Sequence, residues 1–332
     1  MMKQARWAAL VAAAFGAALL PGCGGGGSSG TQTTTGPGGG GATNVLFATD
    51  FEGDIAAFPT LTPTGASFTG QVVASTSTQG SSLAYDAARD ELYSQVSTFV
   101  GGSFHAGVEV FAHASTMQAG ASPARSVTLA GMNSAEQILL ETGSDTLWVN
   151  GSDANSTSMV AVFDHASTLS GTVSPSRKVG VSAFDIAVDA GRSLLYAADE
   201  FGTVSVFADA ATLDGQPMPT RTFGVPEGAG HLTVDGTRDI AYVSSFSTAK
   251  IYIVHGASSA SGLVPLIEIA FPVPSSSGIA TLKVDPLHDR LYVSVGQSVY
   301  LFENASTLTA GSSVPVASVS LPGIAVDSYA FP

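Results

Sequence analysis

The chain has 332 residues, with 26 acidic and 12 basic side chains and a formal net charge of −14 at pH 7. The few basic residues form no cluster, which argues against binding to nucleic acid and against electrostatic docking on anionic lipid. The absence of a sustained 3.6-residue hydrophobic period excludes a helical solenoid, and the single cysteine excludes a disulfide framework.

The first 22 residues are organised like a secretion signal. Lys3 and Arg6 form a positive start, and Trp7–Leu20 is an apolar run that is short for a membrane span. The segment ends in Leu20-Pro21-Gly22-Cys23, which resembles the lipobox of bacterial lipoproteins. That resemblance implies cleavage of the signal before Cys23 and lipidation of this cysteine. The alternative is an ordinary signal peptide with an incidental cysteine.

Several acyl chains on Cys23 would anchor the protein in a membrane, because each buried CH₂ contributes roughly 0.8 kcal/mol. Gly24 follows the cysteine where some lipoproteins carry aspartate, and by resemblance to sorting in two-membrane bacteria this favours the outer membrane. Residues 23–43 are rich in Gly, Ser and Thr and uncharged, so they predict a flexible tether. We therefore expect an exported protein that is lipid-anchored in the bacterial cell envelope.

Residues 44–332 repeat one phrase: an apolar strand that ends in an acid, a turn, and a second apolar strand. The clearest copies are 186–198, 232–244 and 282–294. Each copy predicts an antiparallel β-hairpin, with Asp and Gly suited to its turn. The acids fall at Asp86, Glu141, Asp189, Asp235 and Asp285, and an aromatic follows seven residues later at Tyr93, Trp148, Tyr196, Tyr242 and Tyr292.

A second phrase of the type VxVF follows each hairpin and predicts a third strand that runs into a polar turn. In three copies a proline and then an arginine follow the Phe, and they predict a short outer strand that starts after the proline. These pairs are Pro123/Arg125, Pro175/Arg177 and Pro219/Arg221. Four strands per repeat, with a period of roughly 42–55 residues, predict an all-β fold: a β-propeller with four-stranded antiparallel blades.

The two ends of residues 44–332 carry complementary parts of one further repeat. The acid-ended strand recurs at 324–327 with no partner after it, whereas Val45–Ala48 and Ile55–Phe58 predict second and third strands with no first strand before them. Residues 70–75 suit a fourth strand. We therefore predict six blades, in which one composite blade takes its inner strand from the C-terminus and closes the ring. A seventh blade would need a hidden repeat. We expect a monomer.

The VD…LYV hairpins and the VxVF strands make 44–332 similar to bacterial six- and seven-bladed propellers of the YVTN, NHL-repeat and lactonase-like groups. These groups contain enzymes, binders and scaffolds, so the resemblance implies an architecture rather than an activity. In such propellers ligands favour the mouth of the central channel. The loops expected there carry Asp50, Glu52, Asp54, Asn150, Asp153, Asn155, Asp199, Glu200, Asn133, Glu136, Asp185, Glu227 and His231.

Resemblance to metal-dependent lactonases of this shape implies a Glu, Asn and Asp set that holds one divalent ion at the mouth. The nearest candidates are Glu136, Asp185, Asn133 and His231, and oxygen ligands of this kind suit Ca²⁺ or a similar cation. The alternative is that these polar residues end strands and cap turns. By the same reasoning, the repeated acids, the arginines three residues after them, and the turn residues His113 and His165 are expected to be structural.

Three functions remain open from the sequence. The first is a lipid-anchored propeller that binds a protein or a glycan at the cell envelope without catalysis. The second is a metal-dependent hydrolase of lactonase type, with Glu136 and Asp185 as leading ligands. The third is an envelope protein stiffened by calcium. No catalytic residue can be assigned from the sequence.

Overall fold

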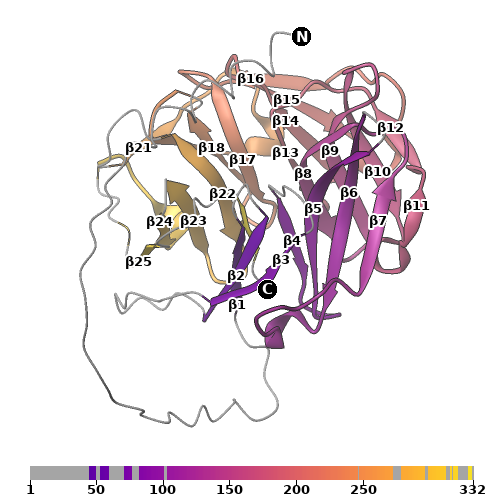
Figure 1. Cartoon of the computed structure of the whole chain (residues 1–332). Coiled ribbons are helices and arrows are strands. Elements are labelled where there is room, and N and C mark those ends of the chain that lie inside the picture. Colours follow the sequence, from indigo (N-terminus) through magenta and orange to yellow (C-terminus); the bar gives the residue numbers. More distant parts are fainter. Residues whose placement is uncertain are drawn as a thin grey trace, which may run out of the picture. The chain divides into compact units, whose positions relative to one another are not determined.

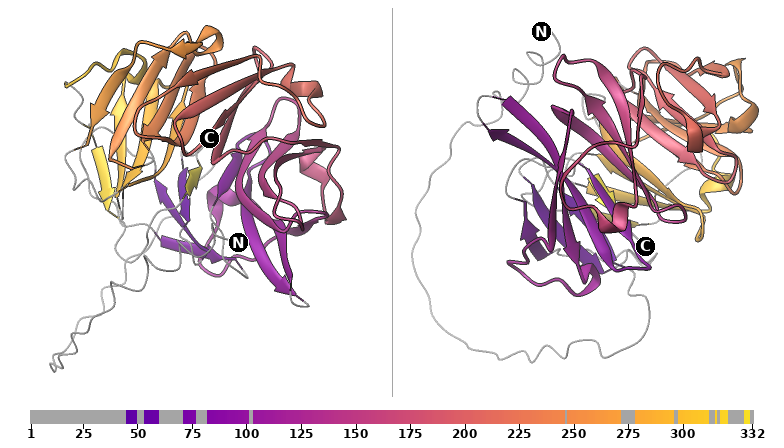
Figure 2. Two further views of the ribbon diagram at one scale, coloured as in Figure 1. Left: turned by 90° about the horizontal axis from the view of Figure 1, so that it is seen from above. Right: turned by 90° about the vertical axis from the view of Figure 1, so that its right-hand side faces the viewer.

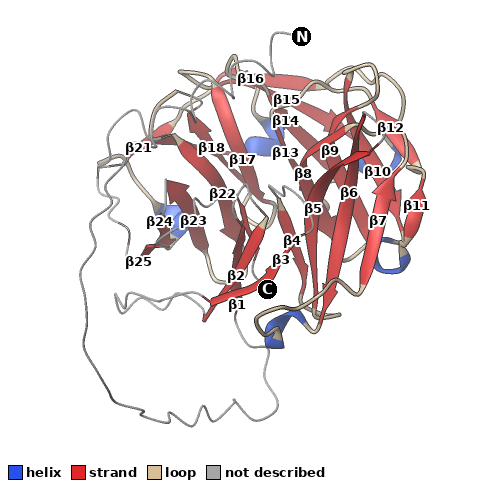
Figure 3. Cartoon of the chain, viewed as in Figure 1, coloured by secondary structure: helices blue, strands red, loops and turns tan. Residues whose placement is uncertain are grey.

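The structure is a computed structural model of the chain, and it describes residues 45–49, 53–59, 71–76, 82–100, 103–245, 247–271, 278–295, 298–311, 315, 317–320 and 328–330. All of them belong to one unit, Ala42–Pro332. The predicted signal, Cys23 and the tether lie outside the described residues. Strands and one-turn 3₁₀ helices make up the regular structure (Figure 3). No helix in the described part of the chain is long and apolar enough to cross a membrane.

The described strands form six sheets, each with a core of four antiparallel strands (Figure 1). Blade 1 contains β26 (Ser328–Ala330), β1 (Val45–Thr49), β2 (Asp54–Pro59) and β3 (Gln71–Ser75), and blade 2 contains β4 (Leu83–Asp86), β5 (Glu91–Val100), β6 (Ser103–Ala112) and β7 (Arg125–Leu129). Blade 3 contains β8 (Ser134–Glu141), β9 (Thr146–Ser152), β10 (Ser158–Asp164) and β12 (Arg177–Val179), and blade 4 contains β13 (Asp185–Asp189), β14 (Leu194–Ala198), β15 (Thr203–Ala208) and β16 (Arg221–Gly224). Blade 5 contains β17 (Ala229–Asp235), β18 (Ile240–Ser245), β19 (Lys250–His255) and β21 (Ile267–Ala270), and blade 6 contains β22 (Ile279–Asp285), β23 (Arg290–Val295), β24 (Ser298–Glu303) and β25 (Ala317–Ser320).

The inner strands close a ring around a common centre (Figure 2). Each contacts the inner strand of the next blade in the order β26, β4, β8, β13, β17, β22 and back to β26. Two short strands, β11 (Gly171–Val173) and β20 (Gly262–Leu263), pair in parallel with the outer strands of blades 2 and 4 and so cover part of an exposed sheet edge. The predicted six-bladed β-propeller is confirmed.

Blade 1 is the predicted composite of both chain ends. The C-terminal strand β26 pairs antiparallel with β1, and Ala330 lies opposite Phe47. The same register places Ala84 opposite Tyr93 in blade 2, so Phe47 is the blade 1 copy of the recurring aromatic. The described inner strand therefore comes from 328–330, because this is the segment in register with Phe47. The predicted segment 324–327 lies outside the described residues.

The inner strands of blades 2 to 6 end in an acid, and in blades 2, 4 and 5 an arginine helps this acid to hold the hairpin turn together. The carboxylates of Asp86, Asp189 and Asp235 are buried. Each accepts a hydrogen bond from the backbone N–H of the arginine three residues later, and a second one from the guanidinium of that arginine. The Nη1–Oδ2 distances are 2.7 Å for Arg89, 3.0 Å for Arg192 and 2.8 Å for Arg238. In all three blades the arginine also contacts the next blade: Arg89 lies 3.7 Å from Asp145, Arg192 donates to Gly236 O, and Arg238 donates to Pro286 O at 2.8 Å. The expected structural role of these acids and arginines is confirmed.

A second acid, four residues after the first, ties the turn to the 3₁₀ helix that follows the third strand. In four blades its carboxylate accepts both the backbone N–H and the hydroxyl of a helix serine: Asp90 with Ser115, Asp145 with Ser167, Asp239 with Ser258, and Asp289 with Ser306. These helices are η2 (Ala114–Thr116), η3 (Ala166–Thr168), η4 (Ala210–Thr212), η5 (Ala257–Ser259) and η6 (Ala305–Thr307).

The residue before each 3₁₀ helix adopts left-handed backbone angles, with φ between 53° and 68°. His113 and His165 occupy this position in blades 2 and 3, and Asp209, Gly256 and Asn304 occupy it in blades 4 to 6. Asn, Asp, His and Gly are the residues most enriched at such angles. The two histidines are therefore turn residues, as expected.

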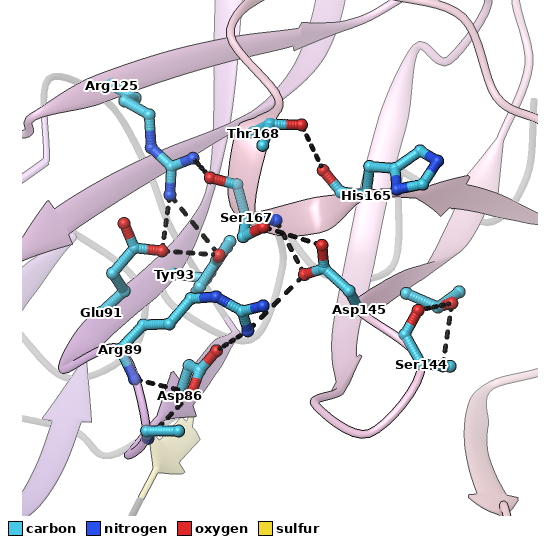
Figure 4. Close-up of polar contacts among 12 residues, drawn as sticks. Asp86, Arg89, Glu91, Tyr93, Arg125, Ser144, Asp145, His165, Ser167 and Thr168 are labelled. Atoms are coloured by element: carbon cyan, nitrogen blue, oxygen red, sulfur yellow. Dashed lines mark hydrogen bonds and ion pairs between the residues drawn. The ribbon is translucent and has the colours of Figure 1, made fainter.

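Large aromatic side chains fill the space between blades. Tyr93 and Trp148 are each 1% exposed and pack in clusters that include residues of the following blade. Arg125 and Arg177, the first residues of two outer strands, lie over these rings at 5.9 and 5.4 Å from the ring centroids. Arg125 also binds Glu91 at 2.7 Å and reaches Ser167 O of the next blade (Figure 4). Blade-to-blade packing is thus both apolar and hydrogen-bonded.

Candidate functional site at the channel mouth

The propeller has two faces, which differ in their loops. We call the face where the inner strands begin the mouth face. The loops between second and third strands, and the loops that enter each inner strand, lie there. The turn face carries the hairpin turns and the 3₁₀ helices. The four predicted metal-site residues, Asn133, Glu136, Asp185 and His231, all lie at the mouth face, at or just before the beginnings of inner strands.

A polar side chain stands four residues before the terminal acid of each inner strand in blades 2 to 6. We call this set the mouth layer; it consists of Ser82, Gln137, Asp185, His231 and Thr281. The inner edge of a blade has no further strand to pair with, so its backbone N–H and C=O groups need other partners. The mouth layer supplies several of them.

Three members of the mouth layer bind the backbone of the following inner strand. Ser82 Oγ accepts from Ile138 N–H at 3.0 Å. Gln137 makes two bonds to Ile186, accepting from its N–H at 2.8 Å and donating to its C=O at 2.9 Å. Asp185 Oδ2 accepts from the N–H of Leu232 at 3.0 Å. These side chains connect blades 2 to 5 in series, and their main role is structural.

Asp185 and His231 form a pair within this layer. The Asp185 carboxylate is only 7% exposed, and its Oδ2 lies 3.1 Å from His231 Nδ1. The imidazole also packs edge-on against Phe184, with 5.3 Å between ring centroids. A carboxylate on one ring nitrogen fixes the orientation of a histidine and leaves the other nitrogen for a ligand or a proton. Among the described residues, none hydrogen-bonds to His231 Nε2.

The structure brings together two of the four predicted metal-site residues. Asp185 and His231 are in contact, whereas Glu136 is exposed on β8 and Asn133 precedes that strand, donating its backbone N–H to Ser152 O at 2.8 Å. No group of three or more His, Cys, Asp or Glu side chains in the described ranges is placed to hold a metal ion. Asp185 and His231 alone are an incomplete ligand set for a divalent cation.

Other acids predicted at the mouth cap their own loops. Asp153 Oδ1 accepts the backbone N–H groups two and four residues on, at 2.8 and 2.9 Å, and Asp199 Oδ1 does the same at 3.0 and 2.8 Å. Asn150 is buried and donates to the C=O groups of Ala183 and Phe184 in the next blade. The turn-capping alternative therefore holds for these residues. Asp50 and Glu52 lie outside the described residues.

Glu227 belongs to a polar cluster at the rim of blade 5. Its carboxylate accepts bonds from Thr248 Oγ1 at 2.6 Å, Lys250 Nζ at 2.9 Å and Tyr252 OH at 3.2 Å. Hydrogen bonds from Thr248 and Lys250 lower the pKa of Glu227. Burial and this carboxylate raise the pKa of Tyr252 to about 12. The cluster fixes the loop that enters β17.

Sequence reasoning missed Lys283, which lies on the inner strand β22 two residues before its terminal acid. Its Nζ donates to Leu83 O of blade 2 at 2.7 Å, past the inner strand of blade 1. Desolvation lowers the pKa of Lys283 to about 8, although Asp185 acts in the opposite direction. A signal was available, because the equivalent residues of blades 2 to 5 are Ala84, Leu139, Ala187 and Thr233.

Two aromatic side chains are exposed on loops of the mouth face. Phe201, at the tip of the β14–β15 loop, is 83% exposed, and Phe104, in the long β5–β6 hairpin, is 50% exposed. Four more exposed large apolar side chains lie elsewhere among the described residues. Leu287, at 84%, is in a hairpin turn of the turn face. Met218 at 85% and Leu263 at 98% lie near the outer edge of blade 4, and Val72 at 39% lies on the outer strand of blade 1.

No family model matches the chain, and no curated protein matches it by sequence. Solved structures do match by shape. One is the WD40 β-propeller domain of Doa1, with 13% identity over 86% of this chain and 82% of that chain and a TM-score of 0.53. Another is a putative 6-phosphogluconolactonase from Bacteroides uniformis ATCC 8492, with 13% identity over 79% of each chain and a TM-score of 0.53. The protein belongs to the structural class of β-propellers, and at this identity the likeness concerns the fold alone.

Proposed function

We propose that the protein is a lipid-anchored module of the bacterial cell envelope that binds a partner protein or glycan through its mouth face, without catalysis. The observation that carries the proposal is Phe201, which is 83% exposed at a loop tip of that face. Exposed aromatic side chains are over-represented where proteins bind partners, because they bury much apolar area with little loss of side-chain entropy.

The arrangement of the mouth layer supports binding over catalysis. Ser82, Gln137 and Asp185 hold backbone groups of the neighbouring blade, so a substrate would have to compete with bonds that keep the ring together. The loop tips make no such contribution to the inner ring. A partner can contact Phe201 and Phe104 without disturbing the fold.

The anchor and tether are the part of the proposal that comes from the sequence. Lipidation of Cys23 would fix the chain to a membrane, in our proposal the outer membrane, with residues 24–43 as a flexible spacer. A flexible Gly-rich segment of this length has a root-mean-square span of about 25 Å. That span lets the propeller turn its mouth face toward a partner beside the membrane.

Site-specific photo-crosslinking in cells tests the proposal. A photoreactive phenylalanine analogue replaces Phe201, and in a matched control it replaces Leu287, which is equally exposed on the turn face. We expect a discrete crosslinked product from position 201 and none from position 287. Equal labelling from both positions, or none from either, would contradict a binding role for the mouth face. A Cys23→Ser variant that still fractionates with the outer membrane would contradict the anchor.

A lactonase-type hydrolase is the second candidate, favoured by the Asp185–His231 pair. The buried carboxylate orients the imidazole, and Nε2 could act as a general base on water at the channel mouth. A bound divalent ion would need ligands beyond this pair, so the candidate depends on the histidine rather than on a metal. Hydrolysis of sugar lactones by the full chain, lost in His231→Gln but not in Thr281→Ser, would favour the enzyme over the binding module.

A further inference from the structure

Three of the five asparagines in the chain begin the triplet Asn-x-Ser/Thr, which is the acceptor pattern for N-linked glycans in exported proteins. These triplets start at Asn150, Asn155 and Asn304. A glycan is bulky and hydrophilic, so an acceptor in a folded protein must lie at the surface with its side-chain amide accessible. The structure separates the three triplets by this requirement.

Asn150 does not meet the requirement. The residue is 1% exposed in β9, and its side-chain amide donates to the C=O groups of Ala183 and Phe184 in the next blade. A glycan on this nitrogen would break both hydrogen bonds and would have no room between the blades. The first triplet is therefore structural.

Asn304 is exposed, but the rest of its triplet belongs to a fixed turn. Ala305 is buried, and Ser306 donates both its backbone N–H and its hydroxyl to Asp289, at 2.9 and 2.7 Å. This is the contact that ties the hairpin turn to the 3₁₀ helix in four blades. A transferase that binds the asparagine together with the hydroxyl of the triplet would have to break this contact, so the third triplet is also disfavoured.

Asn155 lies in the loop between β9 and β10, on the mouth face, where residues 154–157 are all exposed. The loop is held by its own residues. Asp153 Oδ1 accepts the backbone N–H groups of Asn155 and Thr157 at 2.8 and 2.9 Å, and Ser156 adopts left-handed backbone angles with φ of 60°. No side chain of this triplet is buried, so a transferase can bind the triplet without disturbing the packing of the blades.

Asp153 also brings together the two side chains that define the triplet. Hydrogen bonds from the backbone of Thr157 and of Asn155, and from the side chains of both residues, lower the pKa of Asp153. The amide of Asn155 and the hydroxyl of Thr157 therefore lie beside one carboxylate, on the same side of the loop. Such exposed contacts contribute little stability and are easily exchanged for contacts with an enzyme. The other two triplets have Trp148 and Phe302 at the position that Asp153 occupies here, two residues before the asparagine.

We propose that Asn155 is a glycosylation site, at which an oligosaccharyltransferase of the cell envelope transfers a glycan from a polyprenyl diphosphate donor to the side-chain amide. The bond between the first sugar carbon and the donor phosphate breaks, and a bond from that carbon to Asn155 Nδ2 forms. The polyprenyl diphosphate leaves, and the amide loses one proton. This site shares with the proposed function only the export of the chain, and it does not depend on a partner at Phe201.

Mass spectrometry of the full chain, purified from the cells that produce it, tests the site. Trypsin releases residues 126–177 as one peptide, and fragmentation of this peptide distinguishes Asn150 from Asn155. We expect the peptide to carry added mass in whole sugar units, located on Asn155. The tryptic peptide that contains Asn304 should have its unmodified mass.

Four variants define the requirement. The added mass should be lost completely in Asn155→Gln, which removes the acceptor, and in Thr157→Val, which keeps the shape of the side chain but removes the hydroxyl. It should be kept in Thr157→Ser, which retains a hydroxyl, and in the matched control Asn304→Gln. Because the changed side chains are exposed, all four variants should melt with the wild type when the glycan is absent.

Three results would overturn the proposal. An exported chain whose residues 126–177 have only their unmodified mass would mean that Asn155 is not an acceptor. Added mass that persists in Asn155→Gln would place the modification elsewhere, and added mass that persists in Thr157→Val would exclude recognition of the triplet. A chain that retains residues 1–22 in the cytoplasm would instead refute the export on which both this site and the proposed function rest, so the two failures are distinguishable.

Discussion

Blade 4 lacks a stabilising contact that four other blades possess, and restoring it should stabilise the protein. In those blades an aspartate accepts two hydrogen bonds of 2.7–3.0 Å from a serine of the 3₁₀ helix. Blade 4 has Ser193 and Ala211 at these positions, and they share one bond of 3.4 Å, from the Ala211 N–H to Ser193 Oγ. The exchange is Ser193→Asp together with Ala211→Ser. Ser193 has φ of 54°, an angle that aspartate adopts more readily than serine.

The size of the gain follows from the bonds that the double variant acquires. Two charge-assisted hydrogen bonds are worth about 1.5–3 kcal/mol each where they are well shielded. The corresponding carboxylates of Asp145 and Asp289 are 22% and 19% exposed, so solvent screening reduces this value. The loss of conformational entropy when the two new side chains become ordered reduces the gain further. We expect a net gain of about 1–2 kcal/mol in the free energy of unfolding, or about 2–4 °C in melting temperature.

Urea unfolding of the wild type, both single variants and the double variant gives the coupling energy directly. The reverse exchange in blade 5, Asp239→Ser with Ser258→Ala, is the matched control and should lose a similar amount. A double variant no more stable than the wild type, or a coupling energy below about 0.5 kcal/mol, would refute the reasoning, because residues in contact should not behave additively.

Three further predictions concern the turn acids and ring closure. Asp235→Asn should lower the free energy of unfolding by about 2 kcal/mol, because the buried side chain loses its charged hydrogen bond to Arg238. Urea denaturation measures this loss. The control is Asp153→Asn, which changes a loop cap and should lose less. Although burial opposes it, bonds from Thr237 and Arg238 lower the pKa of Asp235. Its stabilisation is therefore complete above the ordinary carboxyl pKa and lost as pH falls through the lowered one; melting temperatures below about pH 4 should fall less steeply in Asp235→Asn. Deletion of 328–332 should cause a large drop in melting temperature, since β1 loses its inner partner, and an unchanged melting curve would contradict closure through β26.

Local signals in the sequence predicted most of the fold. The hairpin acids, the turn residues and the proline before three of the outer strands act within a few residues of one another, so a single copy of the repeat already reveals them. The inner strand of blade 1 was harder to place, because its partner lies at the other end of the chain. The segment 324–327 copies the inner-strand motif, yet the strand in register with Phe47 is Ser328–Ala330.

The candidate site was predicted less well, for a physical reason. Residue type alone favoured Glu136 as a ligand, whereas its neighbour Gln137 is the side chain that joins the mouth layer and binds Ile186. Counting back four residues from each acid would have found that layer. The bond from Lys283 to Leu83 joins residues separated by 200 positions, and no local pattern predicts such a contact.

A polar residue at the mouth of a propeller can either bind a ligand or satisfy unpaired backbone groups of the neighbouring strand. The geometry of the backbone decides which of the two it does. Inner-strand edges leave N–H and C=O groups unpaired, so polar side chains gather there whether or not the protein has a ligand. What distinguishes a functional group is a donor or acceptor left over after the backbone is satisfied. Among the described residues of the mouth layer, His231 Nε2 meets that condition, while the acceptors of Gln137 and Asp185 are in use. Any chemistry at the mouth should therefore depend on His231, and partner binding should depend on the exposed loop tips.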